Sequence, residues 1–234
     1  MKLKDILIIV VFLGVLVGVW FFIKNAENDN SPLEEKKTDE PMKIDLNQKE
    51  EPKAVAPEPD TNNINKDNLN KNMQATINTS EGAFTIEFYE KDAPNTVANF
   101  LKLAKSGFYD GVKFHRVIKG FMDQVGDPLS KDDSKMDMWG TGGPGYKFAD
   151  EINATSALYK TGYKKGVVAM ANSGPNTNGS QFFIMAADYP LPPLYTIFGH
   201  VVSGLDVIMK INETKTGAND RPINPIEIKS ITLK

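Results

Sequence analysis

The chain has 234 residues and a formal net charge of −3, and it contains no cysteine and only two histidines. The slight negative charge argues against nucleic-acid binding as the main role, because phosphate groups are bound by a positive field. Without cysteine there can be no disulfide, thiol catalysis or Cys-ligated zinc, and His115 and His200 are far apart in sequence, so we expect neither a metal centre nor a cofactor.

The first element along the chain is an apolar segment, residues 6–23, which contains no charged residue and no proline. As a helix these 18 residues would span about 27 Å at ~1.5 Å per residue, close to the roughly 30 Å of a bilayer core. Trp20, Phe21 and Phe22 stand at its far end, where aromatic rings favour the membrane interface. A cleaved signal peptide and a buried helix are the alternatives, but no small-residue cleavage site follows the segment and the next tract offers nothing to pack against. We therefore expect residues 1–23 to be an uncleaved transmembrane anchor in a lipid bilayer.

The basic residues around this segment predict its orientation. Lys2 and Lys4 precede it, and Lys24 is the only base close behind it. By the positive-inside tendency the N-terminus stays in the cytoplasm. The chain is therefore expected to be a single-pass membrane protein with its remaining residues on the extracytoplasmic side.

Residues 24–72 have the composition of a spacer. They contain eight Lys against twelve Asp and Glu, a net charge of −4, together with five prolines and no aromatic residue. Such a tract cannot bury enough apolar surface to offset the loss of chain entropy on folding. We expect a disordered acidic linker that holds a folded domain, residues 73–234, away from the membrane.

The folded domain is predicted to open with a β-hairpin and to continue as an all-β fold. Phe84, Ile86 and Phe88 alternate with polar residues, which is the period of a half-buried strand, and residues 80–82 supply the turn before it. The first helix is expected between Asp92 and Gly107, and a second is expected at residues 205–211. Further strands are predicted at residues 113–118, 121–125, 167–171, 181–185, 195–198 and 226–233. Many short strands with two helices indicate a closed antiparallel barrel.

Polar and apolar side chains share strand faces in two segments, FHRVIKGFMDQ from residue 114 and MANSGPNTNGSQFFI from residue 170. Met122 and Gln124 are two residues apart and therefore point the same way on a strand, as do Gln181 and Phe183. A face that presents arginine, glutamine, methionine and phenylalanine together fits neither a core nor a solvated surface. It predicts a shallow apolar pocket rimmed by hydrogen-bond donors. From spacing alone, a surface salt bridge is an equally weighted interpretation of Arg116.

With these motifs the sequence resembles the cyclophilins, which are peptidyl-prolyl cis/trans isomerases. The similarity covers residues 76–233 and includes, in the family's order, FHRVIKGFMDQ, GTGGPGYKFADE and MANSGPNTNGSQFFI. It implies a closed eight-stranded antiparallel barrel capped by two α-helices. It also implies an enzyme that isomerises X-Pro segments of unfolded or exported proteins, here at the outer face of a membrane. The alternative is a tethered peptide-binding or chaperone module without significant turnover.

The resemblance also implies which residues form the site. Arg116 matches the family's catalytic arginine, and His115 beside it is expected to point to the opposite strand face. The residues that match the substrate-binding groove are Phe121, Met122, Gln124, Ala171, Asn172, Gln181, Phe183, Leu191 and Tyr195. The apolar members hold the substrate proline ring, the two glutamines form its polar side, and Asn172 holds the peptide through its backbone.

Three features depart from the family's pattern. Val125 stands where many members have glycine. Residues 130–139 look like an insertion, for which an ordinary surface loop is favoured over a partner contact. By ungapped counting, Pro190 stands where cyclosporin-sensitive members carry a tryptophan, so a reduced affinity for cyclosporin is expected.

Overall fold

In the computed structural model, which describes residues 73–234, the predicted hairpin is present. Strand β1 (Gln74–Thr79) pairs with β2 (Gly82–Phe88) in antiparallel register. The Oγ1 hydroxyl of Thr79 closes the turn by donating to the Gly82 carbonyl oxygen over 2.7 Å. The side chains of β2 that were predicted to face inward are each 5% exposed or less, whereas the residues between them are half-buried. The alternation in the sequence therefore identified both the strand and its buried face.

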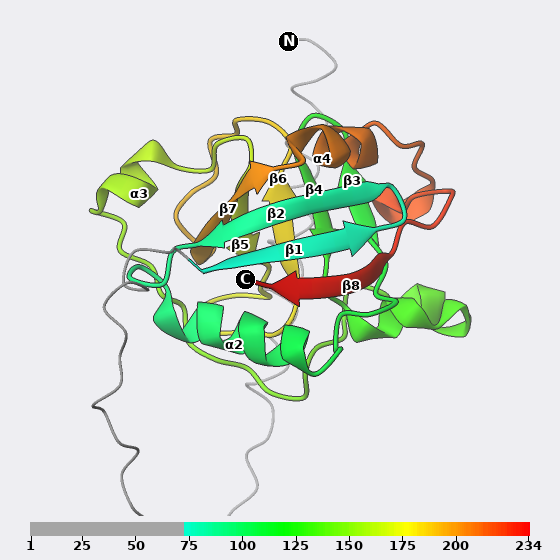
Figure 1. Cartoon of the computed structure of the whole chain (residues 1–234), viewed down its shortest axis with the longest axis horizontal. Coiled ribbons are helices and arrows are strands. Elements are labelled where there is room, and N and C mark those ends of the chain that lie inside the picture. The colour runs from blue at the N-terminus through cyan, green and yellow to red at the C-terminus, as the bar shows by residue number, and fades with distance from the viewer. Residues whose placement is uncertain (1–72) are drawn as a thin grey trace, which may run out of the picture. The chain divides into compact units, whose positions relative to one another are not determined.

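Six further strands complete a single antiparallel sheet. They are β3 (Arg116–Ile118), β4 (Met122–Val125), β5 (Val167–Met170), β6 (Phe182–Met185), β7 (Ile197–Ser203) and β8 (Ile228–Leu233). Neighbouring strands follow the order β3-β4-β6-β5-β7-β2-β1-β8. Figure 1 shows that the sheet curls strongly, so that β2, β1 and β8 lie opposite the remaining strands. The predicted all-β antiparallel fold with eight strands is confirmed.

The curled sheet is open between β3 and β8, which is where the prediction of a closed barrel fails. These two strands are the edges of the sheet and do not pair with each other. They approach just before each strand begins, through an isolated bridge between Lys113 and Glu227. Continuing that register would place His115 opposite Pro225, whose ring fixes φ at about −65°, far from the roughly −140° of an antiparallel strand. The pairing therefore stops after one bridge.

Helices α2 (Pro94–Lys105) and α4 (Leu205–Asn212) are the two predicted helices, and Figure 1 shows them at opposite ends of the curled sheet. The buried residues of α2 are Thr96, Val97, Phe100, Leu103 and Ala104. Four short elements were not predicted: α3 (Ala157–Thr161) and the 3-10 turns η3 (Pro128–Lys131), η4 (Asp133–Met138) and η5 (Ala218–Asp220). Strand β7 is also longer than predicted, because its second half pairs with β2.

The core lies inside the curl, and Phe100 of α2 is at its centre. The Phe100 ring centroid is 5.3 Å from that of Phe88, 5.2 Å from Tyr109, 5.5 Å from Phe182 and 5.7 Å from Phe198. Aromatic pairs at such separations contribute about 0.5–1.5 kcal/mol each beyond the burial of their area. One helix residue thus connects strands β2, β6 and β7.

The predicted anchor (residues 1–23) and the predicted linker (residues 24–72) lie outside the described residues. Within residues 73–234, no helix is both long enough and apolar enough to cross a bilayer.

A buried carboxyl group lies at the α4 end of the core. Asp123 on β4 is fully buried, and burial raises its pKa to about 7, although a hydrogen bond from Asn212 lowers it in part. The Asn212 amide nitrogen donates to Asp123 Oδ1 over 2.7 Å and to the Ile118 carbonyl oxygen over 2.9 Å. Oδ2 of Asp123 has no hydrogen-bond partner in the described part of the chain. Ionisation of this carboxyl group therefore opposes folding.

The substitution Asp123→Asn should make the domain less sensitive to alkaline pH. Because the folded-state pKa is raised, the protonated form stabilises the fold at low pH, and this contribution is lost as the pH rises through about 7. Asparagine keeps the oxygen that accepts from Asn212 and cannot ionise. Between pH 5 and pH 8, the Tm of the variant should rise relative to the Tm of the wild type by on the order of 5 °C. Calorimetry at four pH values tests this, with exposed Asp110→Asn as the control. Parallel curves for Asp123→Asn and wild type would contradict it.

Candidate functional site

Nine of the ten residues predicted for the site line one hollow of about 680 Å³. They are Arg116, Phe121, Met122, Gln124, Ala171, Asn172, Phe183, Leu191 and Tyr195. The tenth, Gln181, lines an adjoining hollow of about 550 Å³, which shares Gln124, Ala171 and Asn172 with the first. The structure therefore brings the two sequence motifs together along one continuous groove.

The floor of the larger hollow is apolar and rigid. Met122 on β4 and Phe183 on β6 belong to a cluster on the sheet face opposite the core, and each is at least 95% buried. The ring of Tyr195 stands edge-on to that of Phe183, with centroids 5.5 Å apart. Tyr195 is fixed in turn by Tyr163, whose hydroxyl donates to the Tyr195 carbonyl oxygen over 2.8 Å and accepts from its amide over 3.1 Å. Such a floor can hold a small apolar ring without rearranging.

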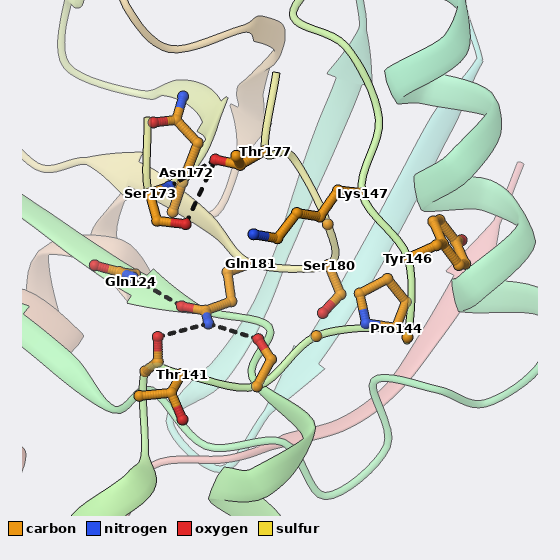
Figure 2. A pocket seen from close by; sticks show the side chains of 16 residues that line it. Gln124, Thr141, Pro144, Tyr146, Lys147, Asn172, Ser173, Thr177, Ser180 and Gln181 are labelled. Carbon is orange, nitrogen blue, oxygen red and sulfur yellow. Dashed lines mark hydrogen bonds between the residues drawn. The ribbon is translucent and has the colours of Figure 1, made fainter. Parts of the chain in front are cut away.

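A chain of side-chain hydrogen bonds forms the polar edge of the groove. Arg116 and Gln124 are register partners on β3 and β4, and Nη1 of Arg116 donates to Oε1 of Gln124 over 3.5 Å. Nε2 of Gln124 donates to Oε1 of Gln181 over 2.9 Å. Nε2 of Gln181 then donates to the carbonyl oxygens of Gly140 and Gly142 over 2.9 and 2.8 Å, as Figure 2 shows. The two amide side chains are thus held in defined orientations.

Arg116 lies at the rim of the pocket and also forms a surface ion pair, which are the two interpretations that its position in the sequence allowed. Its side chain is 45% exposed and lines the larger hollow, and its Nε atom lies 3.6 Å from Oδ2 of Asp220. The guanidinium group carries five N–H donors. It can therefore form this ion pair and still present donors to a bound molecule.

Asn172 is positioned to bind an extended chain through its backbone. Its side-chain amide is already engaged, because Nδ2 donates to the Leu194 carbonyl oxygen over 2.9 Å and Oδ1 accepts from the Gly174 amide over 3.3 Å. Within residues 73–234, the backbone N–H and C=O of Asn172 have no hydrogen-bond partner. Both groups are therefore available at the junction of the two hollows.

His115 is a buried, neutral neighbour of Arg116. It is 5% exposed, and burial lowers its pKa to about 4, against a smaller opposing effect of Asp127. Neither ring nitrogen has a hydrogen-bond partner in the described part of the chain. We expected the ring to point away from the groove; it is buried and also borders the hollow. It adds no positive charge beside Arg116 at neutral pH.

The wall of the second hollow was not predicted residue by residue, although its motif was noted. It comes from residues 140–147 together with Ser173 and Thr177 (Figure 2). Asp127, which is fully buried, holds this loop: its carboxylate accepts hydrogen bonds from the amides of Gly140 and Gly142. A Cβ at Gly142 would lie 2.1 Å from Oδ1 of Asp127, so only glycine fits there. The glycine-rich run GTGGPG was the available signal for this loop.

The three departures from the family's pattern occupy different surroundings. Val125 is fully buried in the core, where it pairs with Phe182. The insertion wraps into η3 and η4 and is largely exposed, and its residues Asp137 and Trp139 also line the larger hollow. The loop with Pro190 places the ring of Tyr189 4.4 Å from that of Phe121, measured between centroids.

Within residues 73–234, no group of three or more histidine, aspartate and glutamate side chains is arranged to hold a metal ion. The donors of the site are guanidinium, amide and backbone groups. The arrangement can bind and polarise a peptide but offers no activated nucleophile.

Comparison with known proteins gives a consistent result. Residues 74–233 match the family model described as cyclophilin type peptidyl-prolyl cis-trans isomerase/CLD. The chain is 45% identical over 156 residues to peptidyl-prolyl cis-trans isomerase CYP18-2 of Arabidopsis thaliana, which covers 66% of this chain and 90% of the relative. It is 48% identical over 159 residues to peptidyl-prolyl cis-trans isomerase ppi1 of Schizosaccharomyces pombe, which covers 67% of this chain and 97% of the relative.

Solved structures show the same similarity. The crystal structure of a cyclophilin type peptidyl-prolyl cis-trans isomerase of Cryptosporidium parvum superposes with a TM-score of 0.62 at 33% identity, covering 70% of this chain and 98% of that one. A second structure of that protein, in the presence of the dipeptide Ala-Pro, gives a TM-score of 0.61 at 34% identity and covers 69% and 98%.

Proposed function

The chain belongs to the cyclophilin-type peptidyl-prolyl cis-trans isomerase family and is an isomerase of this type, and we propose that Arg116 is its catalytic residue. The observation that carries this proposal is the position of Arg116 at the edge of the same hollow whose floor is formed by Met122 and Phe183. A guanidinium group beside an apolar floor matches the two needs of the reaction, which are a grip on the proline ring and a donor for its nitrogen.

The reaction requires rotation about a bond with partial double-bond character. Its barrier is ~18–20 kcal/mol because the nitrogen shares its lone pair with the carbonyl group. In the twisted state this lone pair is uncoupled and can accept a hydrogen bond. A donor from Arg116 aimed at the nitrogen therefore stabilises the twisted state more than either planar isomer, which is the condition for catalysis. Such a charge-assisted bond of ~1.5–3 kcal/mol supplies roughly 10- to 150-fold in rate.

The other groove residues would hold the substrate while the bond turns. The proline ring lies on the floor formed by Phe121, Met122, Phe183 and Leu191, next to Tyr195. The free backbone groups of Asn172 hold the chain before the proline as an added extended segment. Gln124 and Gln181 fix the polar edge, and Ala171 leaves room for the peptide. Because the ring is gripped on one side and the chain on the other, rotation is confined to the bond between them.

The substitution Arg116→Ala should lower kcat/KM for an X-Pro peptide by at least ~10-fold, the lower limit for loss of the charge-assisted bond. The fold should survive, since the side chain is 45% exposed. Arg116→Lys keeps the charge but loses the planar set of donors, and its activity should lie between those of the wild type and Arg116→Ala. A prolyl-isomerisation assay measures all three, with exposed Lys229→Ala as the control. Near-normal turnover by folded Arg116→Ala would overturn the role of Arg116.

The second candidate function is a tethered peptide-binding or chaperone module that uses the same groove without significant turnover. The free backbone groups of Asn172 and the preformed apolar floor favour binding by themselves. The same assay separates the two functions, because a pure binding module would bind X-Pro peptides without accelerating their isomerisation.

We further propose that the isomerase acts on unfolded or exported proteins at the extracytoplasmic face of a membrane. The support is the sequence alone: an uncharged apolar segment at residues 6–23, of spanning length, and an acidic tract before the folded domain. Nucleic acid is not an expected partner of a chain with a net charge of −3.

Full-length protein should sediment with membranes and resist carbonate extraction, because a spanning apolar helix is not released when peripheral proteins are stripped. A chain that starts near residue 72 should stay in the supernatant and retain activity. N-terminal sequencing of protein from cells gives the decisive control. A mature N-terminus after residue 23 would show that the apolar segment is a cleaved signal peptide and not an anchor.

Inhibition by cyclosporin should be weaker than for cyclophilins that carry a tryptophan at the groove. In this chain the corresponding loop offers Tyr189, Pro190 and Leu191, and the Tyr189 ring is packed against Phe121. Loss of an indole donor and its aromatic contact costs ~1–3 kcal/mol, or roughly 5- to 150-fold in affinity. Inhibition titrations beside a tryptophan-bearing cyclophilin measure the difference. Equal inhibition constants would show that this loop supplies the contact in another way.

A further inference from the structure

We propose that Asp220 is a positioning residue for Arg116, and that the insertion holds Asp220 in place through Arg221. This inference rests on the proposed catalytic role of Arg116. Oδ2 of Asp220 lies 3.6 Å from Nε of Arg116, while Nη1 of Arg116 contacts Gln124 at 3.5 Å. The guanidinium plane is thus constrained from two directions, which restricts the rotation of a long side chain with many rotamers.

The backbone that carries Asp220 adopts an uncommon conformation. Asn219 has φ 59° and Asp220 has φ 56°, both in the left-handed region, which Asn and Asp enter more readily than other non-glycine residues. With Asn219 and Asp220 in this conformation, the Asp220 carboxylate points at Arg116.

Backbone hydrogen bonds close the loop around these residues. The amide of Gly217 donates to the Arg221 carbonyl oxygen over 2.8 Å, and the amide of Ile223 donates to the Lys215 carbonyl oxygen over 2.9 Å. The loop is therefore a narrow hairpin with Asp220 near its tip.

The insertion fixes this hairpin from the outside. Nη2 of Arg221 donates to the Met136 carbonyl oxygen over 2.7 Å, and its guanidinium carbon lies 4.9 Å from the centroid of the Trp139 ring. Trp139 is itself held, because Nε1 donates to the Asp132 carbonyl oxygen over 3.1 Å. A continuous set of contacts thus leads from the insertion through Arg221 to the residue beside Arg116.

Other charged groups in the hollow do not replace Asp220. Asp137 lines the same hollow but forms no ion pair with any described residue, and Arg221 is engaged by the insertion. Among residues 73–234, Asp220 is the acid that pairs with Arg116. Removing its charge therefore tests the inference without disturbing a second pair.

The test is the kcat/KM of full-length Asp220→Asn. Asparagine tolerates the left-handed conformation and has nearly the shape of aspartate, so the hairpin is preserved while the charge is removed. We expect a loss of ~2- to 5-fold, the range for a partly exposed ion pair. Asp110→Asn is the matched control, since Asp110 is exposed, lies outside both hollows and has no ion pair with a described residue. A comparable loss in this control would overturn the inference.

Two further readouts separate positioning from a general structural role. In an Arg116→Ala background, Asp220→Asn should cause no additional loss, because the group it positions is gone. In addition, wild-type kcat/KM should fall with added salt, while that of Asp220→Asn should not, because the pair is 45% and 49% exposed and therefore screened. Equal losses in both backgrounds, or identical salt profiles, would overturn the positioning role.

The two variants distinguish a failure of the proposed catalytic role from a failure of the positioning role. If Arg116→Ala retains activity, the catalytic assignment is wrong and the positioning role falls with it. If Arg116→Ala loses activity while folded Asp220→Asn keeps all of it, only the positioning role is wrong.

Discussion

The register between β4 and β6 is the constraint on which the site depends. It places Met122 opposite Met185 and Gln124 opposite Phe183, and so joins two motifs that are far apart in the sequence. A slip of one residue would turn the floor and the polar edge to opposite faces of the sheet. Gly126 permits the close approach at the end of this pairing: it has φ 103°, and a Cβ there would lie 2.3 Å from the Ser180 carbonyl oxygen. The groove is therefore a consequence of strand pairing before it is a consequence of side-chain chemistry.

The parts of the fold that could be predicted are those whose sequence pattern lies within a few neighbouring residues. The hairpin and α2 were predictable, because alternation in β2 and the Pro94 start of α2 are visible within a few residues. The opening between β3 and β8 was not, since it depends on Pro225 falling opposite a segment more than a hundred residues earlier. The turns η3 to η5 carry no hydrophobic period, and their conformations follow from tertiary contacts such as that of Arg221 with Met136.

The same distinction applies to the site. The motifs predicted the residues of the groove, and the structure places them together, but their roles remain proposals until they are measured. The motifs did not reveal which contacts orient the residues of the groove. Gln181 is held by two carbonyl oxygens of a loop that Asp127 fixes from below, and Arg116 is paired with an acid from a distant hairpin. Such contacts join irregular segments, for which neither periodicity nor composition gives a register. The buried carboxyl group of Asp123 was missed for a similar reason: its partner Asn212 comes from the far end of the chain.

The polar edge of the groove also has a direction. From Arg116 through Gln124 and Gln181 to the carbonyl oxygens of Gly140 and Gly142, every nitrogen donates toward the loop and every oxygen accepts from the side of Arg116. The carbonyl oxygens of Gly140 and Gly142 can only accept, so they fix the orientation of the Gln181 amide, and a flip of either glutamine amide would oppose two donors or two acceptors. Because the amides cannot reverse, an acceptor in place of Arg116 would leave the Gln124 oxygen facing another oxygen. The hydrogen bonds of the edge therefore run in one direction only, and the side chain that begins them must be a donor, as arginine is.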